Sequence, residues 1–185
     1  IDVPASLFRA YDIRGVVGDT LTASLAERLG QALATLVQEQ GGRQIAVGRD
    51  ARVSSPSLAE ALISGLTSSG CDVLDIGQAP TPLLYFATHT QPVQAGVMVT
   101  GSHNPTEYNG FKIVVGDRVL DGADLARLRE RMQQGVFNHG SGQVQRVDLL
   151  GDYTEAVNRE VQLARPLKLV VDAGNGVAGE MAIGV

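Results

Sequence analysis

Apolar residues recur every three or four positions in several segments of the chain, and this spacing predicts helices. In the first helix, the hydroxyl of Thr22 suits an N-cap, and Gly41 ends the apolar pattern. The second helix is predicted to begin with Ser55 as its N-cap and Pro56 in its first turn, and to end at Gly70. The remaining helices are predicted over 83–88, 121–135 and 149–163.

Short apolar runs between these helices predict buried strands. The predicted strands lie at 44–47, 73–76, 95–100, 111–115 and 167–171. Strands that alternate with helices are typical of a largely parallel sheet covered on both faces. The dipeptide Asn109-Gly110 predicts a tight hairpin turn, which adds one antiparallel strand. The predicted fold class is therefore α/β, a three-layer α/β/α domain with a mixed, mostly parallel sheet.

The last part of the chain predicts the start of a second structural unit. Residues 135–146 have the weakest secondary-structure pattern of the chain. After the predicted strand at 167–171, a glycine-rich turn runs to Gly179, and six residues remain for the helix that such a turn normally opens. We therefore expect a first domain over 1–147 and the truncated start of a second, similar domain over 148–185.

The composition narrows the classes of protein to which the chain can belong. Of its 185 residues, 44% are hydrophobic and 19% are charged, as in a folded globular protein. The net charge of −5 and the scattered basic residues argue against nucleic acid or an anionic membrane as partner. The single Cys71 fits a reducing compartment, and no apolar run approaches the length of a membrane span. We expect a cytoplasmic protein.

Candidate chemistry gathers between Gly101 and Lys112. A predicted strand ends at this glycine, and the loop that follows presents Ser102, His103 and Asn104 before the next strand begins. The serine does not belong to the Gly-x-Ser-x-Gly motif of α/β hydrolases, because Asn104 occupies the second glycine position. The sequence contains no P-loop motif and no Asp-x-Asp pair, and its histidines lack the spacing of metal ligands.

A serine in such a loop suits the storage of a phosphoryl group. Phosphoserine carries about −1.5 to −2 charges and needs cations and backbone N–H groups around it. Phosphoryl transfer depends mainly on positioning and on charge neutralisation. Gly101 allows the backbone to approach a phosphate on Ser102, and Lys112 can supply a positive charge nearby.

A glycine-rich turn near the end of the chain leaves a second interpretation open. Gly174, Gly176 and Gly179 match the Gly-x-Gly-x-x-Gly fingerprint of dinucleotide-binding proteins and follow a predicted strand. The same pattern also suits an ordinary connection from strand to helix. On the alternative interpretation, the chain is a non-catalytic phosphate- or nucleotide-binding α/β module that uses the turn Gly174–Gly179.

Four groups of residues together resemble the α-D-phosphohexomutase family, and the likeness covers essentially the whole chain. The stretch 100–112, with Thr-Gly-Ser-His-Asn-Pro and then Asn-Gly-Phe-Lys, is similar to the family's active-site loop. Residues 11–15 (Tyr-Asp-Ile-Arg-Gly) and 48–52 (Gly-Arg-Asp-Ala-Arg) resemble its other first-domain motifs. Residues 171–176 resemble the opening of its second domain, and the sequence is close to the bacterial phosphomannomutase/phosphoglucomutase branch.

The resemblance implies a four-domain enzyme that interconverts the 1-phosphate and 6-phosphate of mannose or glucose. Ser102 would carry the phosphoryl group, and the reaction would pass through a 1,6-bisphosphate, with glucose 1,6-bisphosphate as activator. The catalytic residues that it implies are Ser102, His103, Lys112 and Arg14. The residues implied to bind the phosphosugar substrate are Tyr11, Arg14, Asn104 and Lys112.

The resemblance also implies Mg²⁺, bound by the phosphate on Ser102 and by three aspartates of the second domain that this sequence does not contain. The family's sugar-recognition and phosphate-gripping loops are also outside it. We therefore expect this chain to be a fragment that is inactive alone, and the full-length enzyme to be a monomer.

Each candidate side chain also has a purely structural interpretation. His103 can fix the loop through backbone hydrogen bonds, and Lys112 can be a solvated strand end. Tyr11 and Arg14 can fill a structural loop. The charged residues of 49–52 are interpreted as a structural ion-pair turn.

Overall fold

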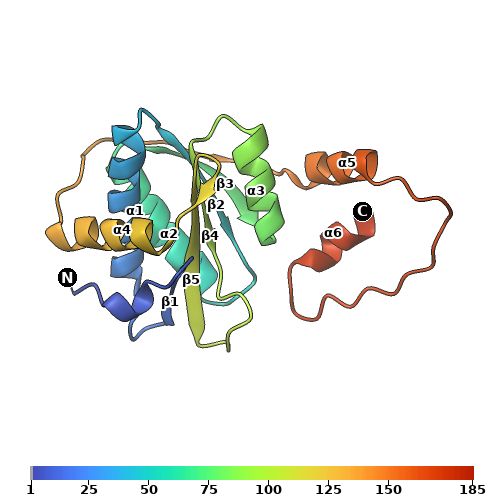
Figure 1. Cartoon of the computed structure of the whole chain (residues 1–185), viewed down its shortest axis with the longest axis horizontal. Coiled ribbons are helices and arrows are strands. Elements are labelled where there is room, and N and C mark those ends of the chain that lie inside the picture. Colours follow the sequence, from blue (N-terminus) through green and yellow to red (C-terminus); the bar gives the residue numbers. More distant parts are fainter. Residues whose placement is uncertain (1) are drawn as a thin grey trace.

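The computed structural model of the chain describes residues 2–185 and contains a sheet with helices on both faces (Figure 1). Residue 1, the first of the predicted first domain, lies outside the described residues. The strands are β1 (Ile13–Val16), β2 (Gln44–Arg49), β3 (Asp72–Gln78), β4 (Ala95–Val99), β5 (Tyr108–Val115), β6 (Arg118–Val119) and β7 (Val144–Arg146). The helices are the 3₁₀ helix η1 (Ala5–Leu7), α1 (Ala23–Glu39), α2 (Ser55–Ser68), α3 (Thr81–Thr90), α4 (Gly122–Gln134), α5 (Leu150–Glu160) and α6 (Ala178–Gly184).

The sheet is mixed, with its parallel pairs on one side and its antiparallel pairs on the other. The strand order is β1-β5-β4-β2-β3-β7, and β6 pairs with the end of β5. Strand β2 runs parallel to β3 and β4, and β3 runs parallel to β7. Strand β5 is antiparallel to β1, β4 and β6. The predicted three-layer α/β/α class is confirmed, with more antiparallel pairing than the sequence pattern predicts.

Two hydrophobic layers hold the helices against the sheet. Helices α1, α2 and α4 cover one face and α3 covers the other (Figure 1). Helices α1 and α2 pack closely because each has a glycine at the contact. A Cβ on Gly30 would lie 2.3 Å from the carbonyl oxygen of Leu62, and a Cβ on Gly65 would lie 1.9 Å from that of Glu27. Larger residues at either glycine would force the two helices apart.

The structure confirms the predicted N-cap of α1 and corrects that of α2. Thr22 accepts a hydrogen bond from the backbone N–H of Leu25 at 3.2 Å, so its role as N-cap is confirmed. The prediction for Ser55 is wrong by one residue, because Ser54 occupies the N-cap position of α2. Ser55 is buried, and its hydroxyl donates to Asp50 Oδ1 at 2.5 Å. A tertiary hydrogen bond thus uses the hydroxyl that the sequence assigns to the helix terminus.

The dipeptide Asn109-Gly110 is not a turn, and this corrects the prediction. Both residues lie inside β5, where Gly110 faces Arg14 of β1. The hairpin of β4 and β5 does exist, but the loop 100–107 closes it. The glycine serves a close approach of two strands, since a Cβ on Gly110 would lie 2.1 Å from the carbonyl oxygen of Ile13.

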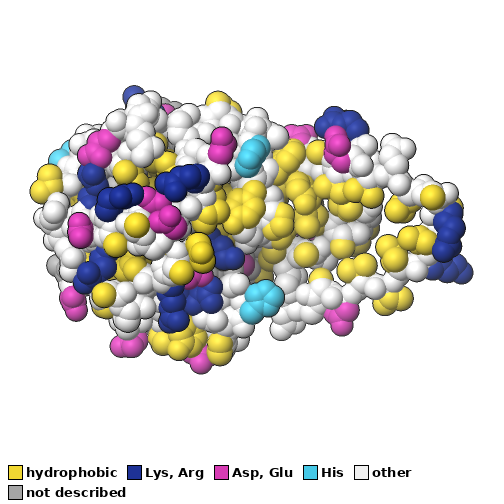
Figure 2. Space-filling model, in the orientation of Figure 1, with side chains coloured by type: hydrophobic (Ala, Val, Ile, Leu, Met, Phe, Trp, Pro, Cys, Tyr) yellow, Lys and Arg dark blue, Asp and Glu magenta, His cyan; other side chains and the backbone are white. Residues whose placement is uncertain are grey.

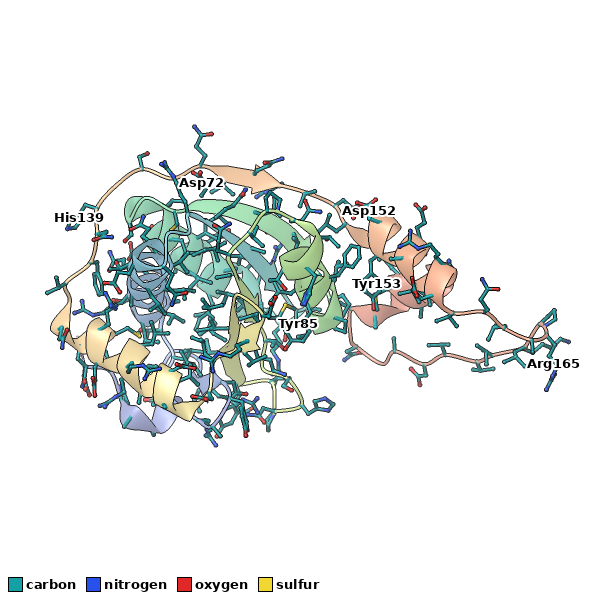
Figure 3. All side chains as sticks on the ribbon, turned by 45° about the horizontal axis from the view of Figure 1, so that its top comes forward. Asp72, Tyr85, His139, Asp152, Tyr153 and Arg165 are labelled. Atoms are coloured by element: carbon teal, nitrogen blue, oxygen red, sulfur yellow. The ribbon has the colours of Figure 1, made fainter. Side chains whose placement is uncertain are left out.

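The sequence pattern predicts no strand at β1, β6 or β7, yet all three join the sheet. Residues 135–146, which have the weakest pattern, end in β7 and pair with β3. Asp72 fixes this segment, because its Oδ1 accepts a hydrogen bond from the backbone N–H of Gln143 at 2.8 Å (Figure 3). The residues of β6 and β7 are all exposed, so these strands have no alternation of apolar and polar positions.

The segment 167–171 forms no strand, which corrects the prediction of a buried strand there. The side chains of Leu169 and Val170 are 74% and 101% exposed. Among residues 2–185 no strand pairs with this segment, and an apolar segment becomes a buried strand only with such neighbours. Figure 2 shows hydrophobic side chains gathered along this part of the chain.

Helix α5 connects this last part of the chain to the sheet domain through an aromatic contact. The ring of Tyr153, which Figure 3 labels, meets that of Phe86 in α3 edge to face, with centroids 5.4 Å apart. The division of the chain into 1–147 and 148–185 stays a prediction. No helix within residues 2–185 combines the length and the apolar character needed to cross a bilayer.

Candidate active site

The loop 100–107 follows the carboxyl end of β4 and carries the predicted serine. Ser102 is half-buried, and its φ of 54° lies in the left-handed region that non-glycine residues seldom adopt. Its backbone N–H donates to Thr100 Oγ1 at 3.0 Å. Backbone conformations of this kind cost about 1–3 kcal/mol and cluster at functional sites. Tertiary contacts therefore hold Ser102 in a conformation that an isolated loop would avoid.

Arg14 reaches this loop from β1, far away in the sequence. Its Nη1 donates to Asn104 Oδ1 at 3.0 Å, and its guanidinium also pairs with Asp12. The Nε of Arg14 is buried and has no hydrogen-bond partner among residues 2–185. The antiparallel pairing of β1 with β5 places Arg14 opposite Gly110 and so beside the serine loop.

A cleft of about 1220 Å³ opens beside the loop. Ser102, His103 and Lys112 line it, so the structure brings these three predicted residues together. Lys112 is half-buried in β5, and no carboxylate in residues 2–185 forms an ion pair with it. The cleft therefore contains a hydroxyl, an imidazole and a lysine ammonium group that is available to an anionic ligand.

The other predicted substrate residues lie outside the lining of this cleft. Arg14 and Asn104 support the serine loop through their mutual hydrogen bond. The Tyr11 side chain is 71% exposed and is not brought to Ser102. In this structure Tyr11 is a surface residue.

Asp50 and Arg52 lie directly against the serine loop, which the sequence pattern does not predict. Their ion pair, with Arg52 Nε 3.4 Å from Asp50 Oδ2, supports the interpretation of 49–52 as an ion-pair turn. Asp50 Oδ2 accepts hydrogen bonds from Thr100 Oγ1 at 2.8 Å and from the backbone N–H of Gly101 at 3.2 Å. Their position directly after a predicted strand could have indicated this contact. Strands β2 and β4 are parallel neighbours, so the segments that follow their carboxyl ends lie side by side.

The glycine-rich turn faces the same cleft. Asn175, Gly176 and the first residue of α6, Ala178, line it together with Ser102. Gly174 has a φ of 55°, and its N–H donates to Asp172 Oδ1 at 2.8 Å. This placement groups the turn with the serine loop instead of giving it a separate site.

Residues 2–185 do not form a metal site by themselves. Within this range, no group of three or more His, Cys, Asp or Glu side chains is arranged to hold a metal ion. The prediction gives Ser102 a single ligand to Mg²⁺, an oxygen of the phosphate on its hydroxyl. The other ligands that the resemblance implies are aspartates outside this sequence.

The fold and the loop define a class of protein: an α/β/α domain that presents a serine in a left-handed conformation, with basic side chains around it, at the carboxyl end of a central strand. The chain belongs to the phosphoglucomutase/phosphomannomutase family. Its residues 5–138 match the sequence model described as "Phosphoglucomutase/phosphomannomutase, alpha/beta/alpha domain I".

Known proteins of this family are similar over nearly the whole chain. A phosphomannomutase/phosphoglucomutase of Pseudomonas aeruginosa is 49% identical over 180 residues, which cover 97% of this chain and 39% of that protein. A phosphoglucomutase of Neisseria meningitidis serogroup B is 42% identical over 182 residues, 97% of this chain and 40% of that protein. A crystal structure of a phosphoglucomutase/phosphomannomutase family protein from Burkholderia thailandensis superposes with a TM-score of 0.95 and 44% identity, over 98% of this chain and 42% of that one.

Proposed function

We propose that this chain is the first domain, with the beginning of the second, of a phosphohexomutase that interconverts hexose 1-phosphate and hexose 6-phosphate. The substrates proposed are the phosphates of mannose and glucose, after the names of the similar proteins. The chain spans about two fifths of the length of these relatives, and the activity is proposed for a protein of their full length.

In this proposal, Ser102 is the residue that carries the phosphoryl group. A hydroxyl of the hexose phosphate attacks the phosphorus on Ser102 Oγ, the P–Oγ bond breaks, and a 1,6-bisphosphate forms, while the leaving Ser102 oxygen takes up a proton and becomes the free hydroxyl. The hydroxyl proton passes to a base, for which His103 is the candidate in the cleft. The reverse transfer, from the other position of the bisphosphate, restores the phosphate on Ser102.

The basic residues of the site have the role of neutralising phosphate charge. Lys112 faces the cleft and is proposed to bind the transferring phosphoryl group. Arg14 is proposed to bind phosphate together with Asn104, to whose Oδ1 its Nη1 donates a hydrogen bond at 3.0 Å. Tyr11 lies outside the cleft lining, and its contact with substrate stays a proposal that rests on the family resemblance.

Magnesium and glucose 1,6-bisphosphate are proposed as cofactor and activator of the longer enzyme. When bound, Mg²⁺ would neutralise charge on the phosphoryl group. We propose that the enzyme is a cytoplasmic monomer that binds neither nucleic acid nor membrane. Burial raises the pKa of the Cys71 thiol to about 11, which keeps the thiol neutral and unreactive at neutral pH.

The observation that carries the proposal is the position of Ser102, with its positive φ, on the wall of a cleft that Lys112 also lines. The test is Ser102→Ala in the full-length enzyme, with Ser64→Ala as a matched control. Ser64 lies on α2 outside the cleft, where its hydroxyl donates to Glu27.

We expect Ser102→Ala to abolish both phosphate incorporation, measured by intact mass, and turnover of glucose 1-phosphate. Ser64→Ala should retain both. The 185-residue chain alone should turn over no glucose 1-phosphate. Survival of incorporation and turnover in Ser102→Ala would contradict the assignment of the phosphoryl carrier.

A further inference from the structure

The guanidinium of Arg52 lies under the serine loop and binds it at several points. Its Nη2 donates to the carbonyl oxygens of Asn104 at 2.6 Å and Ser102 at 3.1 Å. Its Nη1 donates to those of Pro105 at 2.7 Å and Tyr108 at 3.0 Å. One side chain therefore satisfies carbonyl groups along nearly the whole loop, including that of the serine itself.

The carboxylate of Asp50 completes this contact from the other side. It pairs with Arg52 Nε and accepts a hydrogen bond from the backbone N–H of Arg52 at 3.0 Å. The same carboxylate binds Thr100 and Gly101, which enter the loop from β4. The hydroxyl of Ser55 donates a hydrogen bond to Asp50 Oδ1 at 2.5 Å and so helps to hold this carboxylate in place. The Asp50–Arg52 pair thus ties the turn after β2 to both ends of the serine loop.

The pair is also shielded from solvent and closely packed. The side chains of Arg52 and Asp50 are 17% and 18% exposed, so their charge-assisted hydrogen bonds are weakly screened by water. A Cβ on Gly101 would lie 2.4 Å from Arg52 Cζ. The glycine before the serine is therefore explained by the guanidinium that packs against it.

We infer that Arg52, held by Asp50, is a positioning residue that sets the conformation of Ser102 for phosphoryl transfer. This inference rests on the proposed function of Ser102. Arg52 also lines the cleft, but its guanidinium donates to backbone carbonyls and pairs with Asp50, so it acts on the reaction through the loop. The planar fork of arginine can serve four carbonyl groups at once, whereas the compact ammonium group of lysine cannot.

The test compares Arg52→Lys with Arg49→Lys in the full-length enzyme. Arg49 is the matched control, because it lies three positions earlier, at the end of β2, and its ion pair, at 3.9 Å, is with Asp75. Misplacement of a reacting group by about 1 Å can cost about 100-fold in rate. We expect Arg52→Lys to lower kcat about 100-fold with KM within about threefold, and Arg49→Lys to keep kcat within about twofold.

Two further measurements separate positioning from a general loss of stability. Hydrogen exchange of the substrate-free enzyme should be faster at the amides of 100–107 in Arg52→Lys, with unchanged exchange in β2 and β4. Gly101→Ala disturbs the same contact from the loop side and should reproduce both the fall in kcat and the faster loop exchange.

The inference is overturned if folded Arg52→Lys keeps wild-type kcat, or if its loop exchanges hydrogen as slowly as wild type. An equal loss of kcat in Arg49→Lys would also overturn it. The exchange experiment needs no turnover. It therefore tests the effect of Arg52 on the loop even if the Ser102→Ala experiment contradicts the proposed role of Ser102.

Discussion

Gly110 illustrates how a single residue can position a whole loop. The absence of a side chain lets β1 approach β5 until the Ile13 carbonyl lies 2.1 Å from where a Cβ would stand. Next to it, the buried amide of Asn109 donates to the hydroxyls of Ser54 and Ser55 at 2.8 and 2.9 Å. These contacts join the start of β5 to the start of α2 and so define where the serine loop ends.

We predict that Gly110→Ala lowers the free energy of unfolding by about 2 kcal/mol, because an added methyl group in a tightly packed site costs about 1–3 kcal/mol. The measurement is urea unfolding followed by circular dichroism. Gly151→Ala is the matched control, since no atom outside its own stretch of α5 lies within 4 Å of its Cβ position. Alanine suits a helix better than glycine, so the control should be neutral or slightly more stable. Equal stability of both variants would disprove the close approach at β1.

Helix α4 shows how one element is held at its start by a small charged network. Asp121 Oδ1 accepts hydrogen bonds from the backbone N–H groups of Ala123 at 3.0 Å and Asp124 at 3.2 Å. The Asp124 carboxylate accepts a hydrogen bond from the backbone N–H of Asp121 and pairs with Arg118 and Arg127. This capping box satisfies N–H groups that a helix terminus leaves free.

We predict that Asp121→Ala lowers the free energy of unfolding by about 1 kcal/mol, the usual cost of losing an N-cap. Asp117→Ala, in the exposed turn before β6, should change it by less than about 0.5 kcal/mol. Urea unfolding at neutral pH measures both. A cost for Asp117→Ala as large as that for Asp121→Ala would refute the role of the cap.

The pH dependence of this helix start follows from the pKa of Asp124. Burial acts to raise the pKa of Asp124, but hydrogen bonds from Arg127 and the Asp121 backbone, with the charge of Arg118, outweigh it and lower this pKa. The stabilisation is therefore present above the unfolded pKa, about 4, and is lost as the pH falls through the folded pKa. The loss of stability in acid, measured by urea unfolding across this pH range, should be smaller in Asp124→Asn than in wild type.

Across the whole molecule, two irregular segments differ in how they are anchored. Residues 135–143 lie against the domain, because Gly140 and Gly142 donate backbone hydrogen bonds to Ser68 and Thr67 at 3.0 and 2.9 Å. Residues 161–171 have mostly exposed side chains and no strand partner among residues 2–185 (Figure 3). Cleavage by proteases requires local opening, which costs least where few buried contacts must be broken.

We predict that trypsin first cuts the 185-residue chain after Lys168, because the neighbouring Arg165 precedes a proline. Arg146 in β7 is the internal control, since β7 is paired with β3 and Arg146 lies 3.4 Å from Asp75. Mass spectrometry of a time course identifies the first products. The product that ends at Lys168 should keep the unfolding temperature of the intact chain within about 2 °C, as expected for a loss below about 0.5 kcal/mol. Earlier cleavage after Arg146 would contradict this view of the two segments.

Several features of this protein depend only on local spacing and can be predicted from the sequence alone. The apolar periodicity predicts α1 and its cap Thr22, and the apolar runs predict β2, β3 and β4. The residues of the serine loop and the resemblance that they carry are also visible, because they are contiguous. These features follow from the side chains of neighbouring residues, so they require no knowledge of distant contacts.

Other features depend on residues far apart in the chain, and only the three-dimensional arrangement reveals them. The sheet makes Asn109-Gly110, a predicted turn, part of β5, because β1 lies against it. It also brings Arg52 under Ser102, 50 residues away in sequence. Such contacts form where parallel strands end side by side, and a single sequence does not reveal the strand order that sets them. The same dependence explains why 167–171 forms no strand despite its apolar pattern, since a buried strand needs neighbouring strands with which to pair.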